Sequence, residues 1–191
     1  MVNSIGPLEK NIEYGSFGYI KEKEPKIFIK ELKNLYLFQF IFSPMNEQDL
    51  KFLFKREFSL EKLPFLTDVV SNSKNFSMQT EFDKIWVCSS KKTNFFSFKK
   101  FPNLYPIDMT NSKVILNIRG NKSEELLNRL CALDFSKKET SFQTTAMHHI
   151  SVGIYKKEKD IFILFIPRSF ALSLYELIFK ISLQFGVKVE K

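Results

Sequence analysis

The sequence predicts an α+β fold built from two split units, each made of a strand, a helix and two further strands. Segments of strand and helix character alternate along the C-terminal half, between Lys113 and Val187. The N-terminal half has the same order of elements between Leu35 and Phe98, although the two halves share no sequence repeat. The chain has 191 residues, 44% of them hydrophobic and 26% charged, as in an ordinary folded domain. Packed together, two such units form sheets backed by helices.

We expect residues 1–26 to form an extended N-terminal arm and residues 27–191 to form a single α+β domain with lobes 27–101 and 113–191. The arm has no regular hydrophobic period, but it is rich in Tyr and Phe. A free tail seldom carries so many aromatic residues, which favours an arm that lies on a partner over a frayed terminus.

Strand periodicity is clearest in the C-terminal half. Val114, Leu116 and Ile118 alternate with other residues and form one fully apolar face. A second strand fits Ile150 to Ile154. The segment Ile161–Pro167 is apolar on both faces, which predicts a central strand.

Two helices are expected between and after these strands. Asn121 and Glu124 form a capping-box pattern before an apolar stripe of Leu126, Leu127, Leu130 and Cys131. Ser169 is the expected N-cap of the last helix, which Gly186 ends. Its apolar positions recur at helical spacing and are Phe170, Leu174, Leu177, Ile178, Ile181 and Phe185.

The N-terminal lobe is predicted to begin with an edge strand at Ile27–Glu31 and a buried strand at Leu35–Phe42. Asn46 is the expected cap of a helix with an apolar stripe of Leu50, Leu53 and Phe54. Lys84–Ser89 reads as a strand, and Phe95–Phe98 as its hairpin partner. The intervening segments are predicted to be an irregular connection at Leu60–Leu66, a polar loop at Asp68–Ser77 and a linker at Pro102–Met109.

Composition excludes several classes of function. The net charge is +8 and the pI about 9.3, but the lysines are scattered among acidic residues, which favours a solvated surface over nucleic-acid binding. The N-terminus lacks a signal-peptide pattern, and the longest apolar run is too short to span a bilayer. We therefore expect a cytoplasmic protein with no membrane or nucleic-acid partner. The 22 Phe residues fit a coding bias, so single Phe residues are not treated as functional signals.

Chemical motifs are sparse. Cys88 and Cys131 are expected to be buried reduced thiols without metal-ligand spacing. His148 and His149 would point to opposite faces of a strand, which favours a core or surface pair over a metal site. The loop at Gly120 opens a helix and could bind an anion, but a simple cap loop is the more economical interpretation. No nucleotide-binding or nucleophile motif occurs.

Arg168 and Trp86 have two interpretations each. Arg168 opposes the dipole of the helix that it precedes, so a carboxylate partner is expected. That partner is either in this chain, for instance Asp134 or Glu124, or in another chain. Trp86, the single Trp, is expected in the core, with an interface anchor as the alternative.

The C-terminal half resembles the gamma subunit of heterotetrameric sarcosine oxidase. The resemblance rests on Arg119-Gly120 at a strand end, the segment Ser123–Phe135 with its Cys-x-Leu-Asp ending at Cys131 and Asp134, and Gln143-Thr144. The other matching segments are Pro167–Ile178, which begins Pro-Arg-Ser-Phe, and Phe185-Gly186. The arm is also similar to that of the family. As family-motif or interface candidates we take Arg119, Gly120, Cys131, Asp134, Pro167, Arg168, Ser169 and Phe170.

The resemblance implies a fold related to the folate-binding module of the aminomethyltransferase family. It implies a non-catalytic structural subunit that works with alpha, beta and delta chains in oxidative demethylation of sarcosine to glycine. It places FAD, covalent FMN, NAD and tetrahydrofolate on partner subunits, with no catalytic, cofactor or metal residues on this chain. The alternatives are a stand-alone folate-binding or aminomethyltransferase-like module and, last, an RNA-associated protein.

Overall fold

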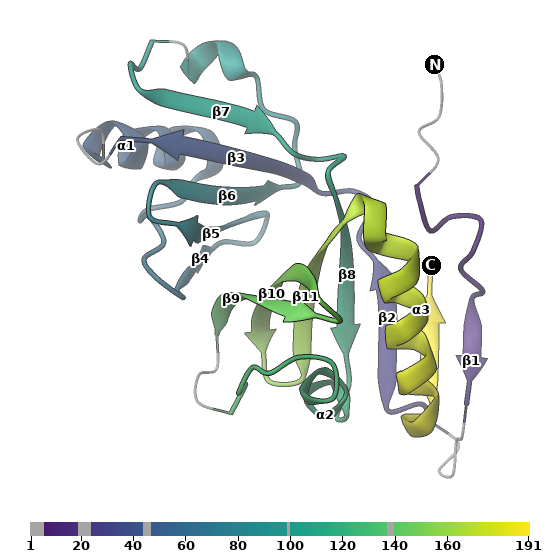
Figure 1. The fold of residues 1–191 in the computed structure, drawn as a ribbon. Coiled ribbons are helices and arrows are strands. Elements are labelled where there is room, and N and C mark those ends of the chain that lie inside the picture. The colour runs from purple at the N-terminus through teal and green to yellow at the C-terminus, as the bar shows by residue number, and fades with distance from the viewer. Residues whose placement is uncertain (1–5, 19–23, 44–46, 99, 137–139) are drawn as a thin grey trace. The chain divides into compact units, whose positions relative to one another are not determined.

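The computed structural model describes residues 6–18, 24–43, 47–98, 100–136 and 140–191, and two compact units are distinguished within the chain. The first comprises Met1–Lys33, Ser112–Thr140 and Thr144–Lys191. The second comprises Asn34–Asn111 and Ser141–Gln143. We call them the seven-stranded and the five-stranded unit after their sheets (Figure 1). The predicted organisation as one domain with lobes 27–101 and 113–191 stays a prediction.

The seven-stranded sheet combines strands from both ends of the chain. Its order is β1-β12-β2-β8-β11-β10-β9, with β12 and β2 parallel and the other neighbours of described register antiparallel. The strands are β1 (Gly15–Phe17), β2 (Ile27–Glu31), β8 (Lys113–Arg119), β9 (Ser141–Met147), β10 (Ile150–Glu158), β11 (Ile161–Pro167) and β12 (Val187–Glu190).

The predicted strands of the C-terminal half are confirmed, including the central position of β11 between β8 and β10. The prediction of Ile27–Glu31 as an edge strand is wrong. β2 has the predicted bounds but lies between β12 and β8, because the short C-terminal strand β12 and then β1 extend the sheet beyond it. β12 was not predicted.

One face of this sheet carries the core of the unit. Alternate residues of β8, Val114, Leu116 and Ile118, are buried there with α3 (Ala171–Ser182) and the short helix α2 (Ser123–Asn128). Leu8 is fully buried in the same core. The described part of the arm therefore packs on its own unit through Leu8 and β1, and a contact of the arm with a partner stays a prediction.

The helix ends differ in detail from the predictions. The N-cap of α2 is Lys122 rather than Asn121, and no side chain caps the helix. Ser169 lies within the 3-10 turn η3 (Arg168–Phe170), and Phe170 takes the N-cap position of α3. The predicted C-terminal end is confirmed, because the 3-10 turn η4 (Leu183–Phe185) follows α3 and Gly186 leaves it at a φ of 73°.

The five-stranded sheet has the order β4-β5-β6-β3-β7, with all neighbours antiparallel (Figure 1). Phenylalanines from β3, from α1 and from η2 form one aromatic core, and Phe40, Phe54 and Phe98 are fully buried in it. The predicted stripe of α1 is confirmed, while its expected cap Asn46 lies outside the described residues. The elements are β3 (Tyr36–Phe42), α1 (Glu47–Phe58), β4 (Val69–Ser71), β5 (Asn75–Glu81), β6 (Lys84–Ser89), the 3-10 helix η2 (Phe95–Phe98) and β7 (Leu104–Asp108).

Three predictions for this unit are wrong. The polar loop expected at Asp68–Ser77 is the hairpin β4–β5, whose turn is held by Asn72: its carboxamide oxygen accepts from the amides of Lys74 and Asn75 at 2.9 and 2.8 Å. Phe95–Phe98 is the 3-10 helix η2, since β6 already has β5 and β3 as neighbours. The expected linker at Pro102–Met109 contains β7, the edge strand beside β3.

The two units share a common arrangement. In each, a strand and a helix are followed by three strands, as β3–α1–β4–β5–β6 and as β8–α2–β9–β10–β11. The sheet order is also the same, β4-β5-β6-β3 and β9-β10-β11-β8. The repeated order of elements that the sequence predicted is therefore present, with one further strand in each unit.

Candidate interaction site

The residues predicted as site candidates fall into two groups at opposite ends of the seven-stranded sheet. Arg119 lies opposite Ile161 at one end of the β8–β11 pair, and Pro167 lies opposite Lys113 at the other end. The two ends are six positions apart along β8, on the order of 20 Å. The candidates therefore do not form one site.

Arg119 and Gly120 both have structural contacts within the chain. The Arg119 guanidinium donates to Glu190 Oε1 at 2.8 Å and lies 4.4 Å from the centre of the Phe28 ring. Gly120 has a φ of 123°, and a Cβ built there would lie 2.2 Å from the Lys26 carbonyl oxygen. Only glycine fits this close approach of two backbones.

The loop after Gly120 behaves as a cap loop. The Ser123 amide donates to the Gly120 carbonyl at 2.9 Å, and the Ser123 hydroxyl donates to the Asp160 carbonyl at 3.0 Å. These bonds use the groups that an anion would need, which agrees with the more economical interpretation of this motif.

Cys131 and Asp134 follow α2. Cys131 is half-buried, its Sγ lies 3.4 Å from the Leu127 carbonyl oxygen, and burial raises the pKa of its thiol. Asp134 accepts hydrogen bonds from the amide and hydroxyl of Ser136 at 3.0 and 2.6 Å. Both residues lie in the loop after α2, and the raised pKa of the Cys131 thiol disfavours the thiolate form that a nucleophile needs.

Arg168 lies near a buried carboxylate that the sequence did not single out. Burial has the largest effect on the pKa of Glu31 and raises it. The positive charges of Lys33 and Arg168 lower this pKa, and the negative charge of Glu9 raises it. The Glu31 side chain is 10% exposed, and Lys33 Nζ lies 3.9 Å from its Oε2. The two partners suggested for Arg168 both have other contacts. Glu124 Oε2 lies 3.6 Å from Lys156 Nζ, and Asp134 Oδ1 accepts a hydrogen bond from the Ser136 hydroxyl. Ser169 and Phe170 beside it are exposed.

The two histidines form a turn rather than part of a strand. His148 and His149 connect β9 to β10 with φ values of 48° and 67°, and both are exposed. The expectation that they point to opposite faces of a strand is wrong, because two left-handed residues form the hairpin turn. Over the described part of the chain, no cluster of three or more His, Cys, Asp or Glu residues could hold a metal ion.

Trp86 and Cys88 lie on the face of the five-stranded sheet opposite the aromatic core, which contains their neighbours Ile85 and Val87. The Trp86 indole donates to Gln39 Oε1 at 3.0 Å, and its ring lies 6.0 Å from that of Phe142. Only 7% of Trp86 is exposed, so the core interpretation is confirmed. Burial raises the pKa of the Cys88 thiol well above its usual value, which keeps it protonated and unreactive.

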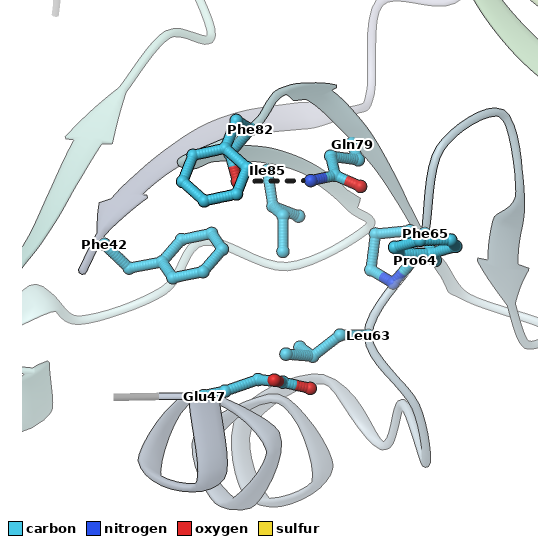
Figure 2. A pocket seen from close by; sticks show the side chains of 8 residues that line it. All are labelled: Phe42, Glu47, Leu63, Pro64, Phe65, Gln79, Phe82 and Ile85. Carbon is cyan, nitrogen blue, oxygen red and sulfur yellow. Dashed lines mark hydrogen bonds between the residues drawn. The ribbon is translucent and has the colours of Figure 1, made fainter. Parts of the chain in front are cut away.

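The five-stranded unit contains an apolar groove (Figure 2). It has a volume of about 250 Å³ and lies between the start of α1, the connection before β4 and the β5–β6 hairpin. Two polar side chains, Glu47 and Gln79, lie among its walls. The apolar walls are Phe42, Leu63, Pro64, Phe65, Phe82 and Ile85.

A second hollow of about 310 Å³ adjoins the groove and shares Phe65, Gln79 and Phe82 with it. Leu66, Thr80 and Glu81 complete its lining. Among the described residues that line the two hollows there is no cysteine, serine or histidine, while Glu47, Thr80 and Glu81 supply two carboxylates and a hydroxyl. The mainly apolar lining is suited to binding apolar groups.

Gln79 fixes the two walls of the groove. Its Oε1 accepts from the Leu66 amide at 2.9 Å, and its Nε2 donates to the Phe82 carbonyl at 3.2 Å, the bond drawn in Figure 2. The side-chain amide thereby links the connection before β4 to the β5–β6 turn. Leu66 is held with a φ of 52°, a conformation that a large side chain rarely adopts.

The sequence analysis missed this groove. Its walls come from segments read as an irregular connection, a strand and a turn, which fold together only in three dimensions. A signal was present in Phe65-Leu66 and Phe82, large apolar residues at positions where the chain turns. That signal was discounted with the other phenylalanines of a Phe-rich chain.

No family model and no curated protein matches the sequence. Two solved structures have similar folds at 12% sequence identity. One is heterotetrameric sarcosine oxidase from Corynebacterium sp. U-96 in complex with pyrrole 2-carboxylate, with a TM-score of 0.74 over 83% of this chain and 85% of that chain. The other is glycine cleavage system aminomethyltransferase T from Bartonella henselae, with a TM-score of 0.61 over 87% of this chain and 48% of that chain. The chain thus spans about half the length of the aminomethyltransferase.

These similarities confirm the predicted fold class. The fold is α+β, with two units in which a strand and a helix are followed by three strands, and resembles the sarcosine oxidase and aminomethyltransferase folds. None of the described helices has both the length and the apolar character needed to span a lipid bilayer.

Proposed function

We propose that this chain is a non-catalytic structural subunit of a sarcosine oxidase-like flavoenzyme complex, in the position of a gamma subunit. The supporting observation is the match to a chain of heterotetrameric sarcosine oxidase at a TM-score of 0.74. The match covers similar shares of both chains, 83% and 85%, so the matched chain is about as long as this one. A fold match between two short chains of similar length favours an equivalent small subunit over a fragment of a larger enzyme.

The contacts of the candidate residues also support a structural role. Arg119 is paired with Glu190, and Gly120 lies against the backbone of Lys26. The groove is lined mainly by apolar side chains and offers a docking surface.

In this proposal the chemistry belongs to partner chains. FAD, covalent FMN and NAD would lie on alpha and beta subunits, and tetrahydrofolate on the alpha subunit, in a cytoplasmic assembly that also contains a delta chain. The complex would demethylate sarcosine oxidatively to glycine, with tetrahydrofolate as the one-carbon acceptor and oxygen as the electron acceptor. This chain would contribute surfaces that hold the larger chains in place.

The test is co-expression of the tagged chain with the genes that adjoin its own, followed by affinity purification and an absorption spectrum. We expect a stoichiometric yellow complex with larger flavin-bearing chains. The tagged chain purified alone should be colourless. Retention of FAD or FMN by the isolated chain, or recovery of a lone chain from the co-expression, would contradict the proposal.

The fold similarity to aminomethyltransferase T favours one alternative, a stand-alone folate-binding or aminomethyltransferase-like module. Such a module needs a site for the pterin within the chain itself. Calorimetric titration of the isolated chain with tetrahydrofolate distinguishes the two functions. Saturable binding supports the module, and the structural subunit predicts no heat of binding.

A further inference from the structure

The groove and the adjoining hollow share a rim of exposed apolar side chains. Phe65, Leu66 and Phe82 are 67%, 68% and 77% exposed. All three border the hollow, and Phe65 and Phe82 also line the groove. Large apolar side chains gathered at a concave surface, with polar groups around them, are typical of a protein-protein contact.

Hydrogen bonds within the chain hold the rim of the groove in place. Gln79 bonds the backbone on both sides of the groove, at Leu66 and at Phe82. The turn before β4 is closed by the Asp68 amide, which donates to the Phe65 carbonyl at 2.9 Å. Because the rim is already ordered, little conformational entropy is lost when it binds a partner.

The dimensions favour an inserted side chain over a small-molecule ligand. Ligand sites commonly measure about 300–1,000 Å³ and contain convergent polar groups that orient the ligand. The groove is smaller, at about 250 Å³, and the hollow lies at the lower end of that range, at about 310 Å³. The amide of Gln79 is already used in both directions by the backbone, and so it has little left to orient a ligand.

The charge of the lining indicates the chemistry of the occupant. The charged residues that line the two hollows are Glu47 and Glu81, both acidic, although the chain as a whole has a net charge of +8. Glu47 forms an ion pair with Lys51 at 2.7 Å, and Glu81 forms one with Lys84 at 2.5 Å. Both carboxylates are more than half exposed, and ion pairs at such positions are weak, so a cation from a partner can join or replace them.

Addition of a partner strand to β7, an edge strand of the five-stranded sheet, is a less suitable mode of binding. The Met109 amide donates to the Leu37 carbonyl, which fixes the alternation along the β3–β7 pair. Pro106 then occupies an outward-facing position of β7, where it has no amide hydrogen to offer a further strand. Strand addition at the β7 edge is therefore disfavoured, and none of the residues that line the groove or the hollow belongs to β7.

We propose that the groove binds an extended segment of a partner subunit, which inserts a large apolar side chain flanked by lysine or arginine. The inference rests on the proposed function to the extent that the partner is a subunit of the same assembly. The chemistry of the groove itself can be tested on the isolated chain.

The first experiment titrates the isotope-labelled chain with three synthetic peptides and follows amide shifts by NMR. One peptide has a Phe-Leu pair between lysines, the second has the same pair between glutamates, and the third has a Ser-Ser pair between lysines. We expect the first to shift the amides around Phe65, Leu66 and Phe82 and to bind at least about tenfold more tightly than the other two.

Variants locate the binding. Phe82→Ser should weaken binding of the first peptide by about tenfold or more. The matched control is Phe52→Ser, because Phe52 is also an exposed aromatic residue of this unit, at 59%, and lies on α1 outside both linings. The control should bind as the unaltered chain does. Equal binding of all three peptides, shifts confined to other surfaces or no binding at millimolar peptide would overturn the proposal.

The second experiment places the same variants in the co-expressed assembly. If Phe82→Ser lowers recovery of the larger chains and Phe52→Ser does not, the groove is a contact with a partner subunit. If the complex forms equally well with Phe82→Ser, the groove proposal is wrong while the proposed function stands. If no complex forms but the lysine-flanked peptide binds at the groove, the proposed function is wrong and the chemistry of the groove stands. Concentration-dependent dimerisation lost in Phe82→Ser would instead assign the groove to a second copy of this chain and overturn the proposal.

Discussion

The seven-stranded and five-stranded units have the same arrangement of four strands and a helix but complete it differently. After β11 the seven-stranded unit adds the helix α3 of 12 residues, and β2, β12 and β1 continue its sheet beyond β8. After β6 the five-stranded unit adds only the 3-10 helix η2 of four residues and the single strand β7. The first unit therefore gains a second helix over its core, while the second relies on α1 and a cluster of phenylalanines.

This difference is visible in the exposed surface. Among the described residues, the large apolar side chains that remain exposed include Tyr14 and Phe170 in the seven-stranded unit. The five-stranded unit exposes more of them, namely Phe52, Phe65, Leu66, Phe82, Tyr105 and Ile107. One arrangement of elements thus supports both a self-contained core and a surface suited to a partner.

The largest expected effect tests the aromatic core of the five-stranded unit. The Phe40 ring lies 5.2 Å from those of Phe54 and Phe98 and 5.9 Å from that of Phe58. Phe40→Ala should lower the free energy of unfolding by about 3–5 kcal/mol, because it removes a buried ring and leaves a cavity. Urea unfolding followed by circular dichroism measures the loss.

Leu164→Ala is the matched variant in the seven-stranded unit, where Leu164 is also fully buried. Its expected loss is about 2–5 kcal/mol. Hydrogen exchange should then show whether each substitution loosens its own unit first. A loss below about 1 kcal/mol for Phe40→Ala would contradict the aromatic core described here.

A smaller effect is expected at the glycine that ends β8. Gly120→Ala places a Cβ 2.2 Å from the Lys26 carbonyl oxygen at a φ of 123°. Strained backbone of this kind costs about 1–3 kcal/mol. Gly120→Ala should therefore lower the free energy of unfolding by about that amount, and thermal unfolding should show a lower melting temperature. Gly6→Ala is the control, because its nearest new contact is an ordinary 3.5 Å, and it should change stability by less than about 0.5 kcal/mol. Equal effects of the two substitutions would show that Gly120 is not constrained.

The β9–β10 turn allows a stabilising change in the seven-stranded unit. Replacing His148-His149 with Asn-Gly should raise the free energy of unfolding by about 1 kcal/mol, since both positions are left-handed and that dipeptide favours such turns. Differential scanning calorimetry measures the gain. An Ala-Ala replacement keeps the strain and removes the imidazoles, so it should give no gain. If Ala-Ala stabilises as much as Asn-Gly, the turn conformation is not the cause.

The smallest effect concerns the pH dependence of stability through Glu31. Burial raises the pKa of this carboxyl above 4.5, so the folded chain holds the proton at pH values where the unfolded chain has released it. The contribution of Glu31 to stability is therefore complete at low pH and is lost as the pH rises from about 4.5 through the folded-state pKa. Glu31→Gln should remove this slope and raise the melting temperature at pH 7. The exposed Glu81→Gln should leave the slope in place, and an unchanged slope in Glu31→Gln would contradict the assignment.

Much of the fold could be predicted because the strands of the central sheet have strong local patterns. Val114, Leu116 and Ile118 alternate regularly. β11 is apolar on both faces, and its residues from Phe162 to Ile166 are all buried. In the first half the same patterns predicted β3, α1 and β6.

The missed elements lack such patterns. β12 has four residues and pairs in parallel with β2, a contact that only the folded chain creates. β7 contains Pro106, which suggested a linker and in fact lies at a sheet edge where proline is tolerated. The β4–β5 hairpin is rich in Asn and Ser, and its Asn72 holds a turn instead of marking a long loop.

The candidate site was harder to predict than the fold. The residues chosen from the resemblance lie at the two ends of the seven-stranded sheet, as Arg119 and Pro167 show. The groove instead depends on Gln79, which joins Leu66 to the β5–β6 turn across 13 positions of sequence. No local pattern predicts that bond, although exposed apolar residues in turns gave an indication of it.

The central claim is that the chain is a structural subunit, and its omission tests this most directly. The larger chains encoded beside it would be co-expressed with and without this chain, and the mass and flavin content of the soluble product measured by native mass spectrometry. We predict one defined flavin-bearing assembly that contains this chain, and incomplete or insoluble larger chains in its absence. A complete assembly of unchanged mass, yield and sarcosine oxidation without this chain would contradict the account.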